Sequence, residues 1–195
     1  KEAVEIAVHV KGLDFPGHDP RATTSLAINY ATGTRGACHL RGFSHCGEGG
    51  MFIPEANFKE PIDRFTMEGK AKLAILFQNL ASLSDSLVLC IFMQTGGESL
   101  TEIADSYNSI TGNNLHPLEF LEIGERIWNL QRLINISDNI SRKDDKLPKI
   151  MFVPAINGSR KGKIPVPFES SLDEYYLKRG WDKNGIPTEK TLNRL

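Results

Sequence analysis

The chain has 195 residues, a formal net charge of -1 and a hydrophobic content of 40%, enough to bury the core of one domain. Lysine and arginine are scattered rather than gathered in stripes, so the sequence predicts neither a nucleic-acid surface nor a membrane-binding patch. The longest apolar run, Leu87 to Met93, is far shorter than the roughly 20 residues that cross a bilayer.

The cysteines indicate the compartment. Cys38, Cys46 and Cys90 form an odd set without regular spacing, which argues against a disulfide framework and for a reducing, cytoplasmic environment. The chain begins at Lys1 without a methionine. We therefore expect residues 1–195 to be one helical domain, a piece of a longer protein.

The N-terminal part begins with weak alternation from Val4 to Val10, which predicts a short strand or an extended lead-in. Residues 12–17 are predicted to be a loop. Asp19-Pro20 sets a capping carboxylate before a proline, so a helix should run from Pro20 to Thr32 and stop at Gly33.

The middle of the chain should be irregular over the glycine-rich residues 35–56. A helical region is predicted from Pro61 to Ala81, and a second helical segment carries residues 85–93. After Gly96-Gly97, a helix should begin at Glu98 or Ser99 and end at Gly112.

The clearest helix begins at Pro117. Its predicted apolar face consists of Phe120, Ile123, Ile127, Leu130 and Ile134, widened by Leu121 and Trp128. Residues 143–146 are predicted to be a solvated turn, and 147–169 an ordered loop. A short helix should run from Ser171 to Arg179 before Gly180, and Thr188 should cap a last helix. The predicted fold is mainly α, an irregular helical domain with long ordered loops.

Two adjacent pairs, Cys38-His39 and His45-Cys46, offer the ligand types of a tetrahedral zinc site. Their five-residue gap is not a usual finger spacing, and neighbouring positions make simultaneous ligation awkward. The sequence therefore favours unligated side chains over a zinc site.

Several basic side chains lie on turns beside glycines, at Lys11, Arg21, Arg35 and Arg41. Glycine lets the backbone approach a bulky ligand closely, so these donors could bind such a ligand. They could equally satisfy helix ends and loop carbonyls, and the spacing does not decide between the two.

The segment from Asp85 to Cys90 places a carboxylate five residues before a lone cysteine in apolar surroundings. A carboxylate accepts hydrogen bonds from ring N–H groups, and a thiolate binds metal. A cysteine in apolar company is more often just a small buried hydrophobe, so the pattern gains meaning only from its companions.

Taken in order, several segments resemble the C-terminal part of the tungsten-containing aldehyde:ferredoxin oxidoreductase family. They are Val10–Asp14, Asp19–Arg21, Tyr30–Thr32, Arg35–Arg41, Asp85–Cys90, Ile123–Ile127, Asp145–Pro148 and Tyr175–Thr188. The resemblance implies a tungsten or molybdenum bis-pterin beside a 4Fe-4S cluster. It also implies oxidation of a small aldehyde to a carboxylic acid, with ferredoxin taking the electrons.

The resemblance also implies site residues. Asp85 matches a carboxylate that hydrogen-bonds a pterin, and Leu89 belongs to the same pterin-binding segment. Cys90 matches a cluster ligand. His39 matches a histidine near the metal, a hydrogen-bond donor or proton carrier for the reacting carbonyl, and Arg41 a basic residue near the pterin.

The chain also departs from the family. Val88 stands where the family normally has glycine, so its side chain could crowd the pterin or shift the backbone; Ser137 and Asn139 replace an arginine and a glycine. These differences suggest a divergent member.

The family's upstream three-cysteine run is absent from this sequence. We therefore expect the isolated chain to be inactive and without cofactor. It should expose apolar surface where N-terminal and middle domains dock, and self-association is plausible. The alternatives are a non-catalytic helical binding or assembly domain that has lost the cofactor, and a zinc-stabilised domain.

Overall fold

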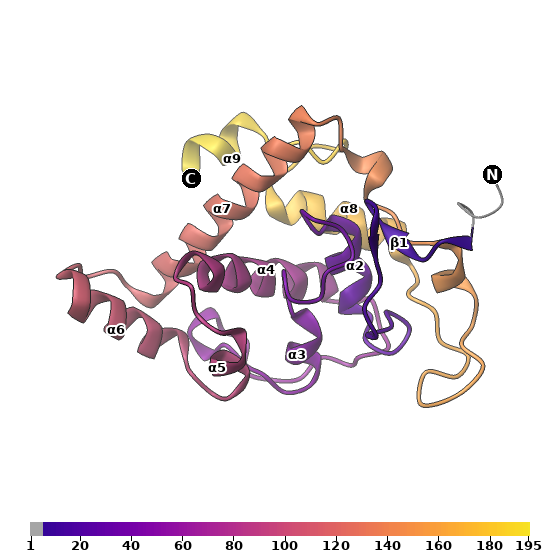
Figure 1. The fold of residues 1–195 in the computed structure, drawn as a ribbon, viewed down its shortest axis with the longest axis horizontal. Helices are drawn as coiled ribbons and strands as arrows, with labels where there is room; N and C mark the ends of the chain where they lie inside the picture. Colours follow the sequence, from indigo (N-terminus) through magenta and orange to yellow (C-terminus); the bar gives the residue numbers. More distant parts are fainter. Residues whose placement is uncertain (1–5) are drawn as a thin grey trace.

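The computed structural model describes residues 6–195 and shows a mainly helical fold with a small two-stranded sheet (Figure 1). This confirms the predicted fold class. Strands β1 (His9–Val10) and β2 (Leu13–Asp14) pair antiparallel, with Val10 opposite Leu13. Among the described residues, no helix combines the length and apolar character needed to cross a membrane.

Helix α4 (Lys70–Ser86) runs through the centre of the molecule (Figure 1). It packs against α2 (Ser25–Thr32), α3 (Ser44–Glu48), α7 (Pro117–Ser137) and α8 (Phe168–Arg179). Helix α7 approaches α4 closely at Gly124, where an added Cβ would lie 2.0 Å from the carbonyl oxygen of Asn79. Only glycine therefore allows α7 to lie this close to α4.

The core has two parts. One surrounds α2 and α8 and includes both tryptophans of the chain, Trp128 and Trp181, which are 0% and 5% exposed. The other lies between α4, α7 and α6 (Leu100–Thr111), around Phe77 and Phe120. Because α4 contributes to both parts, it joins them into one body.

A buried ion-pair network supports the first core. Asp145 follows the 3-10 helix η2 (Arg142–Asp144), is 2% exposed, and lies 2.8 Å from Arg132 and 2.7 Å from Lys11. The Tyr176 hydroxyl donates to the same carboxylate. Burial alone would raise the pKa of Asp145, but the two cations outweigh it and hold the pKa below its usual value. The prediction of a solvated turn over 143–146 is therefore wrong at Asp145, although Lys143 and Lys146 are exposed.

Helix-end signals in the sequence are confirmed at several places. Ser99 caps α6 in a reciprocal capping box with Glu102, and Gly112 ends that helix with a φ of 74°. Helix α7 begins at Pro117, as predicted. Thr188 caps α9 (Glu189–Arg194) by accepting a hydrogen bond from the Thr191 backbone.

Two predicted helix starts are wrong. Helix α2 begins at Ser25 rather than Pro20, because Asp19 bonds the backbone and side chain of Arg21 and closes a turn there instead. Helix α4 begins at Lys70 rather than Pro61, after Gly69 in a left-handed conformation. It also continues through Asp85, which lies in its last turn and not in a separate segment.

Other differences are smaller. Helix α3 and the 3-10 helix η1 (Pro54–Ala56) lie inside the stretch predicted to be irregular, and β2 lies in a predicted loop. Helix α8 begins at Phe168, three residues early, and the 3-10 helix η3 (Lys149–Phe152) interrupts the loop before it. The strand predicted from Val4 falls partly outside the described residues.

The buried face of α7 differs from the predicted apolar face. Leu130 and Ile134 are 59% and 54% exposed, whereas Asn129 and Arg132 are buried. These polar side chains have buried partners, because Trp181 donates to Asn129 and Asp145 pairs with Arg132. Specific polar contacts therefore set the rotation of the helix.

Candidate functional site

The connection from α4 to α5 (Ile91–Thr95) carries the carboxylate and the thiol singled out in the sequence. The Leu89 amide bonds back to the Ser84 carbonyl, which closes the end of α4. Cys90 then adopts an extended conformation as the N-cap of α5. The side chains of Asp85 and Cys90 are exposed and Leu89 is half-buried, so both reactive groups are accessible on either side of the turn that joins α4 to α5.

Val88 is the strained residue of this turn. Its φ is 57° and its side chain is 89% exposed. A β-branched residue rarely adopts this left-handed conformation, whereas glycine does so at no steric cost. The backbone thus holds the conformation that suits glycine, the residue that the family resemblance leads us to expect here.

Arg41 pairs with Asp85 at 2.6 Å, with side chains 37% and 49% exposed. The pair joins the loop after α2 to the end of α4, so the fold brings together two predicted site residues from distant segments. Arg41 contacts only one carboxylate oxygen of Asp85. The other oxygen has no hydrogen bond within residues 6–195 and is available to an N–H donor.

His39 lies in a group of three imidazole rings. Its ring centroid is 4.4 Å from that of His18 and 5.7 Å from that of His45, and the last two are 4.8 Å apart. The sequence brought His39 and His45 together as neighbours along the chain, but nothing in its spacing connected His18 with them.

The surroundings of His39 and His45 disfavour the positively charged form of each ring. Burial and the neighbouring His18 lower the pKa of His39. Burial, followed by His18 and His39, lowers the pKa of His45 to about 4. His45 is therefore an uncharged ring at neutral pH, and His39 favours the same state.

The zinc alternative lacks a ligand set. In the part of the chain that the structure describes, no group of three or more His, Cys, Asp or Glu side chains could hold a metal ion. The nearest contact is between His45 Nε2 and Cys46 Sγ, at 3.7 Å. All three cysteines are free.

Among the other basic residues, Arg21 and Lys11 have structural partners. Arg21 pairs with Asp19 at 2.7 Å and donates to the carbonyls of Ile150 and Val153. Lys11 forms an ion pair with Asp145. Arg35 instead lies with Arg41 in the wall of a shallow pocket of about 220 Å³. The sequence left open whether these basic residues bind a ligand or satisfy loop carbonyls, and Arg21 does the latter.

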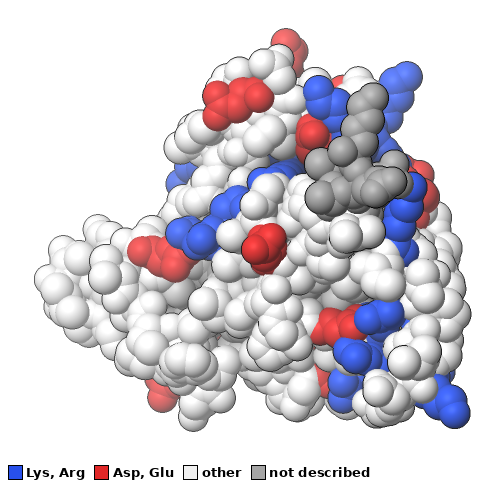
Figure 2. All heavy atoms as spheres, turned by 45° about the vertical axis from the view of Figure 1, so that its right-hand side comes forward, with Lys and Arg blue, Asp and Glu red and all other residues white. Residues whose placement is uncertain are grey.

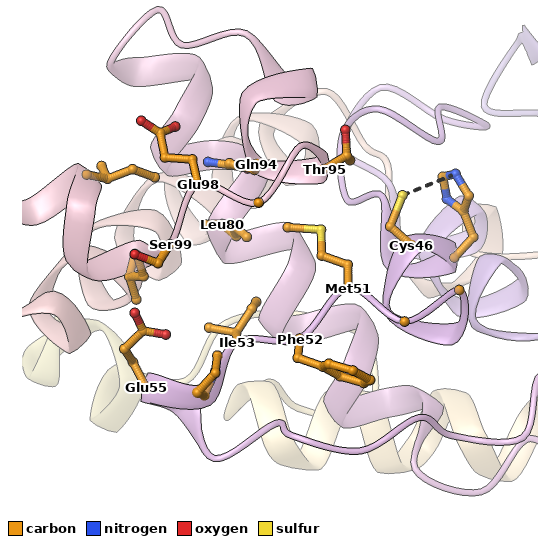
Figure 3. Close-up of a pocket in the computed structure, with 17 residues that line it drawn as sticks. Cys46, Met51, Phe52, Ile53, Glu55, Leu80, Gln94, Thr95, Glu98 and Ser99 are labelled. Carbon is orange, nitrogen blue, oxygen red and sulfur yellow. Dashed lines mark hydrogen bonds between the residues drawn. The ribbon is translucent and has the colours of Figure 1, made fainter.

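A larger cavity of about 740 Å³ has His45 in its wall. Figure 3 shows its labelled residues, with Cys46 at one end and Glu55, Glu98 and Ser99 at the other. Its walls come from α3, α4, α5, α6 and η1. The apolar wall residues are Met51, Phe52, Ile53, Pro54, Leu80, Leu100 and Ile103. No motif in the sequence indicated this cavity.

Charge on the surface does not single out another site. On the face shown in Figure 2, basic and acidic side chains are intermixed and separated by uncharged surface. The view therefore agrees with the scattered distribution read from the sequence.

Comparison with known proteins gives a consistent result. A family profile described as aldehyde ferredoxin oxidoreductase, domains 2 & 3, matches residues 1–195. Tungsten-containing aldehyde ferredoxin oxidoreductases of Thermococcus kodakarensis and Pyrococcus furiosus are each 36% identical over 191 residues, 95% of this chain and 30% of the relative. An aliphatic sulfonate oxidoreductase, WOR-like subunit, of Pyrococcus furiosus is 28% identical over 204 residues, 100% of this chain and 28% of the relative. The chain thus spans less than a third of the length of these curated relatives.

Proposed function

Since this chain belongs to the aldehyde ferredoxin oxidoreductase family, we propose that it forms part of an enzyme that oxidises aldehydes. In the balanced reaction an aldehyde and water yield a carboxylic acid, two protons and two electrons. The electrons leave through an iron-sulfur cluster to ferredoxin. The observation that carries this proposal is the exposure of Asp85 in the last turn of α4 and of Cys90 at the start of α5.

The residues present fit one side of such a cofactor. The exposed thiol of Cys90 would provide one of the four ligands that a 4Fe-4S cluster needs, and the others would come from outside this chain. The free oxygen of Asp85 would accept a pterin N–H, while Arg41 holds the other oxygen. Leu89 would pack beside the same pterin. The tungsten or molybdenum bis-pterin, when bound, supplies the two-electron chemistry.

His39 is the proposed proton carrier. A largely uncharged imidazole can accept a proton released during oxidation. His18 lies beside it and is exposed, which gives that proton a neighbouring group in contact with water.

The isolated chain should be inactive, because one thiolate cannot hold a cluster. Phe92, Met93 and Val88 are exposed apolar residues near Cys90 in the sequence, and we expect the N-terminal and middle domains to cover them. Without those domains, the same residues would favour self-association. Three free cysteines suit a reducing, cytoplasmic environment.

The test uses the full-length protein. Cys90→Ser should lose cluster iron and aldehyde-dependent dye reduction, and Asp85→Asn should lower tungsten content. Cys38→Ser is the matched control and should retain both, because Cys38 is a free cysteine with no proposed ligand role. A metal-free full-length protein that reduces no dye would contradict the proposal.

The strain at Val88 favours a second candidate, a non-catalytic binding or assembly domain that has lost the cofactor. It predicts a folded full-length protein without tungsten, both as found and after Val88→Gly. Recovery of tungsten in the Val88→Gly protein would instead support the enzyme.

A further inference from the structure

We propose that the 740 Å³ cavity holds the organic part of the substrate and selects neutral or cationic aldehydes over anionic ones. This inference rests on the proposed function and extends it to substrate class. It depends on where the cavity lies, what lines it, and how its wall is charged.

The cavity is lined by residues that follow the two candidate segments in the chain: His45 and Cys46 come after Arg41, and Gln94 and Thr95 come after Cys90. At one end is His45, whose ring lies 5.7 Å from that of His39. Another wall is formed by α5, which begins directly after Cys90. A carbonyl placed beside the histidines would therefore leave the rest of the molecule inside the cavity.

The size and lining suit an apolar body. A volume of about 740 Å³ falls in the range of small-molecule sites, which are mostly apolar with a few polar groups. In Figure 3, Met51, Ile53 and Leu80 lie around the middle of the space, between the histidine end and the acidic end. An aromatic ring or a short alkyl chain would bury its surface here.

The charge of the wall is negative. Glu55 and Glu98 line the cavity, and no lysine or arginine does so among the described residues. Burial alone would raise the pKa of Glu55, but hydrogen bonds from its own backbone and from Thr101 outweigh it and lower the pKa. Glu55 is therefore ionised at neutral pH.

The wall also has acceptor atoms without donors. Oε2 of Glu55, Oε2 of Glu98 and Oε1 of Gln94 are buried with no hydrogen-bond partner among residues 6–195. Gln94 is only 2% exposed, and its amide nitrogen already donates to Ser84. Unpaired buried acceptors are costly, so a ligand with an N–H or O–H group would relieve that cost.

A ligand with a carboxylate would meet the opposite situation, because it adds negative charge and another acceptor to this wall.

The test compares three probes that share a benzyl or phenyl frame and differ in charge, using calorimetric binding to the full-length protein. Benzylamine and benzyl alcohol should bind, and benzoate should bind about tenfold more weakly or worse. In a parallel kinetic test, kcat/KM for benzaldehyde should exceed that for 4-formylbenzoate by a similar factor.

Variants assign the effect to the wall. Glu98→Gln and Glu55→Gln should each narrow the gap between benzylamine and benzoate, whereas Glu122→Gln, on the exposed side of α7, should leave it unchanged. If Glu55→Gln fails to fold because Glu55 anchors the start of α6 through Thr101, Glu98→Gln still decides.

Benzoate binding as tightly as benzylamine, or no binding of any probe, would overturn the inference. Either result leaves the proposed function standing if the full-length protein contains tungsten and reduces dye with benzaldehyde. Loss of dye reduction with selective binding retained would overturn the proposed function alone.

Discussion

Two arginine–aspartate pairs of similar length occupy very different regions of this protein. Arg132 and Asp145 lie 2.8 Å apart with both side chains 0% exposed, and Arg41 and Asp85 lie 2.6 Å apart with side chains 37% and 49% exposed. Water screens the second pair, so it contributes little to stability. Removing one partner of the first leaves a buried charge uncompensated. Burial, rather than distance, decides that one pair stabilises the fold and the other remains available for binding.

The largest effect is expected at Asp145. Asp145→Asn leaves Lys11 and Arg132 buried without a carboxylate, which should lower the free energy of unfolding by about 3–5 kcal/mol. Chemical denaturation measures this. Asp173→Asn is the control, since Asp173 is 64% exposed and pairs with Arg142 at the surface, and it should cost less than about 1 kcal/mol. Equal losses of unfolding free energy in the two variants would refute the distinction between buried and exposed pairs.

Lowering the pH should also show the stabilising role of the buried Asp145 carboxylate. The pKa of Asp145 is lower in the folded protein than in the unfolded chain, so the unfolded chain binds the proton more readily. The stabilisation is present above the unfolded pKa of about 4 and is lost as the pH falls through the folded pKa. Denaturation midpoints between pH 7 and 3 should therefore fall more steeply for the native protein than for Asp145→Asn. Parallel curves would contradict this.

The next effect is expected at the crossing of α4 and α7. Gly124→Ala places a Cβ against the Asn79 carbonyl, and the helices must separate, at a cost of about 1–3 kcal/mol. Thermal unfolding measures it. Gly49→Ala is a matched control, because its Cβ would have no neighbour closer than 3.4 Å. An unchanged melting temperature for Gly124→Ala would show that the crossing is loose.

At the exposed turn, Val88→Gly should stabilise the protein. Releasing a left-handed β-branched residue gains about 1–2 kcal/mol, and the added freedom of glycine in the unfolded chain offsets about half of it. Asn139→Gly provides the comparison. Asn139 has a similar φ of 63°, but asparagine tolerates this conformation, so the gain there should be smaller. A loss of stability at Val88→Gly would mean that the valine side chain makes a useful contact.

The smallest change in stability is expected for Arg41→Gln, less than about 1 kcal/mol. Its effect should instead appear in the tungsten content of the full-length protein, because Asp85 loses the partner that orients it. Denaturation and metal analysis of the same preparation separate the two. A large loss of stability would show that the Arg41–Asp85 pair stabilises the fold, as the buried Arg132–Asp145 pair does.

Local signals in the sequence predicted local structure well. Ser99, Gly112, Pro117 and Thr188 fixed helix ends because each acts on its own backbone neighbours. The two proline-based helix starts were wrong: Asp19 closes a turn next to Pro20, and α4 begins only after Gly69.

Contacts between residues far apart in the chain could not be predicted from the sequence. Asp145 pairs with Lys11, which is far away along the chain, and His18 joins His39 and His45 from a separate segment. The family and the mainly helical class were predicted and confirmed. The roles of His39, Arg41, Asp85, Leu89 and Cys90 stay predictions until the variants are measured.

The placement of the two tryptophans has a practical consequence for these measurements. Both indoles are shielded from water. The guanidinium of Arg132 lies over the indole of Trp181, with its Cζ 4.8 Å from the ring centroid. The emission spectrum of the tryptophans will therefore respond to changes in the interior around Asp145. It will not respond to a local change at the turn that carries Cys90. A change in emission will thus identify which of the two regions has been disturbed.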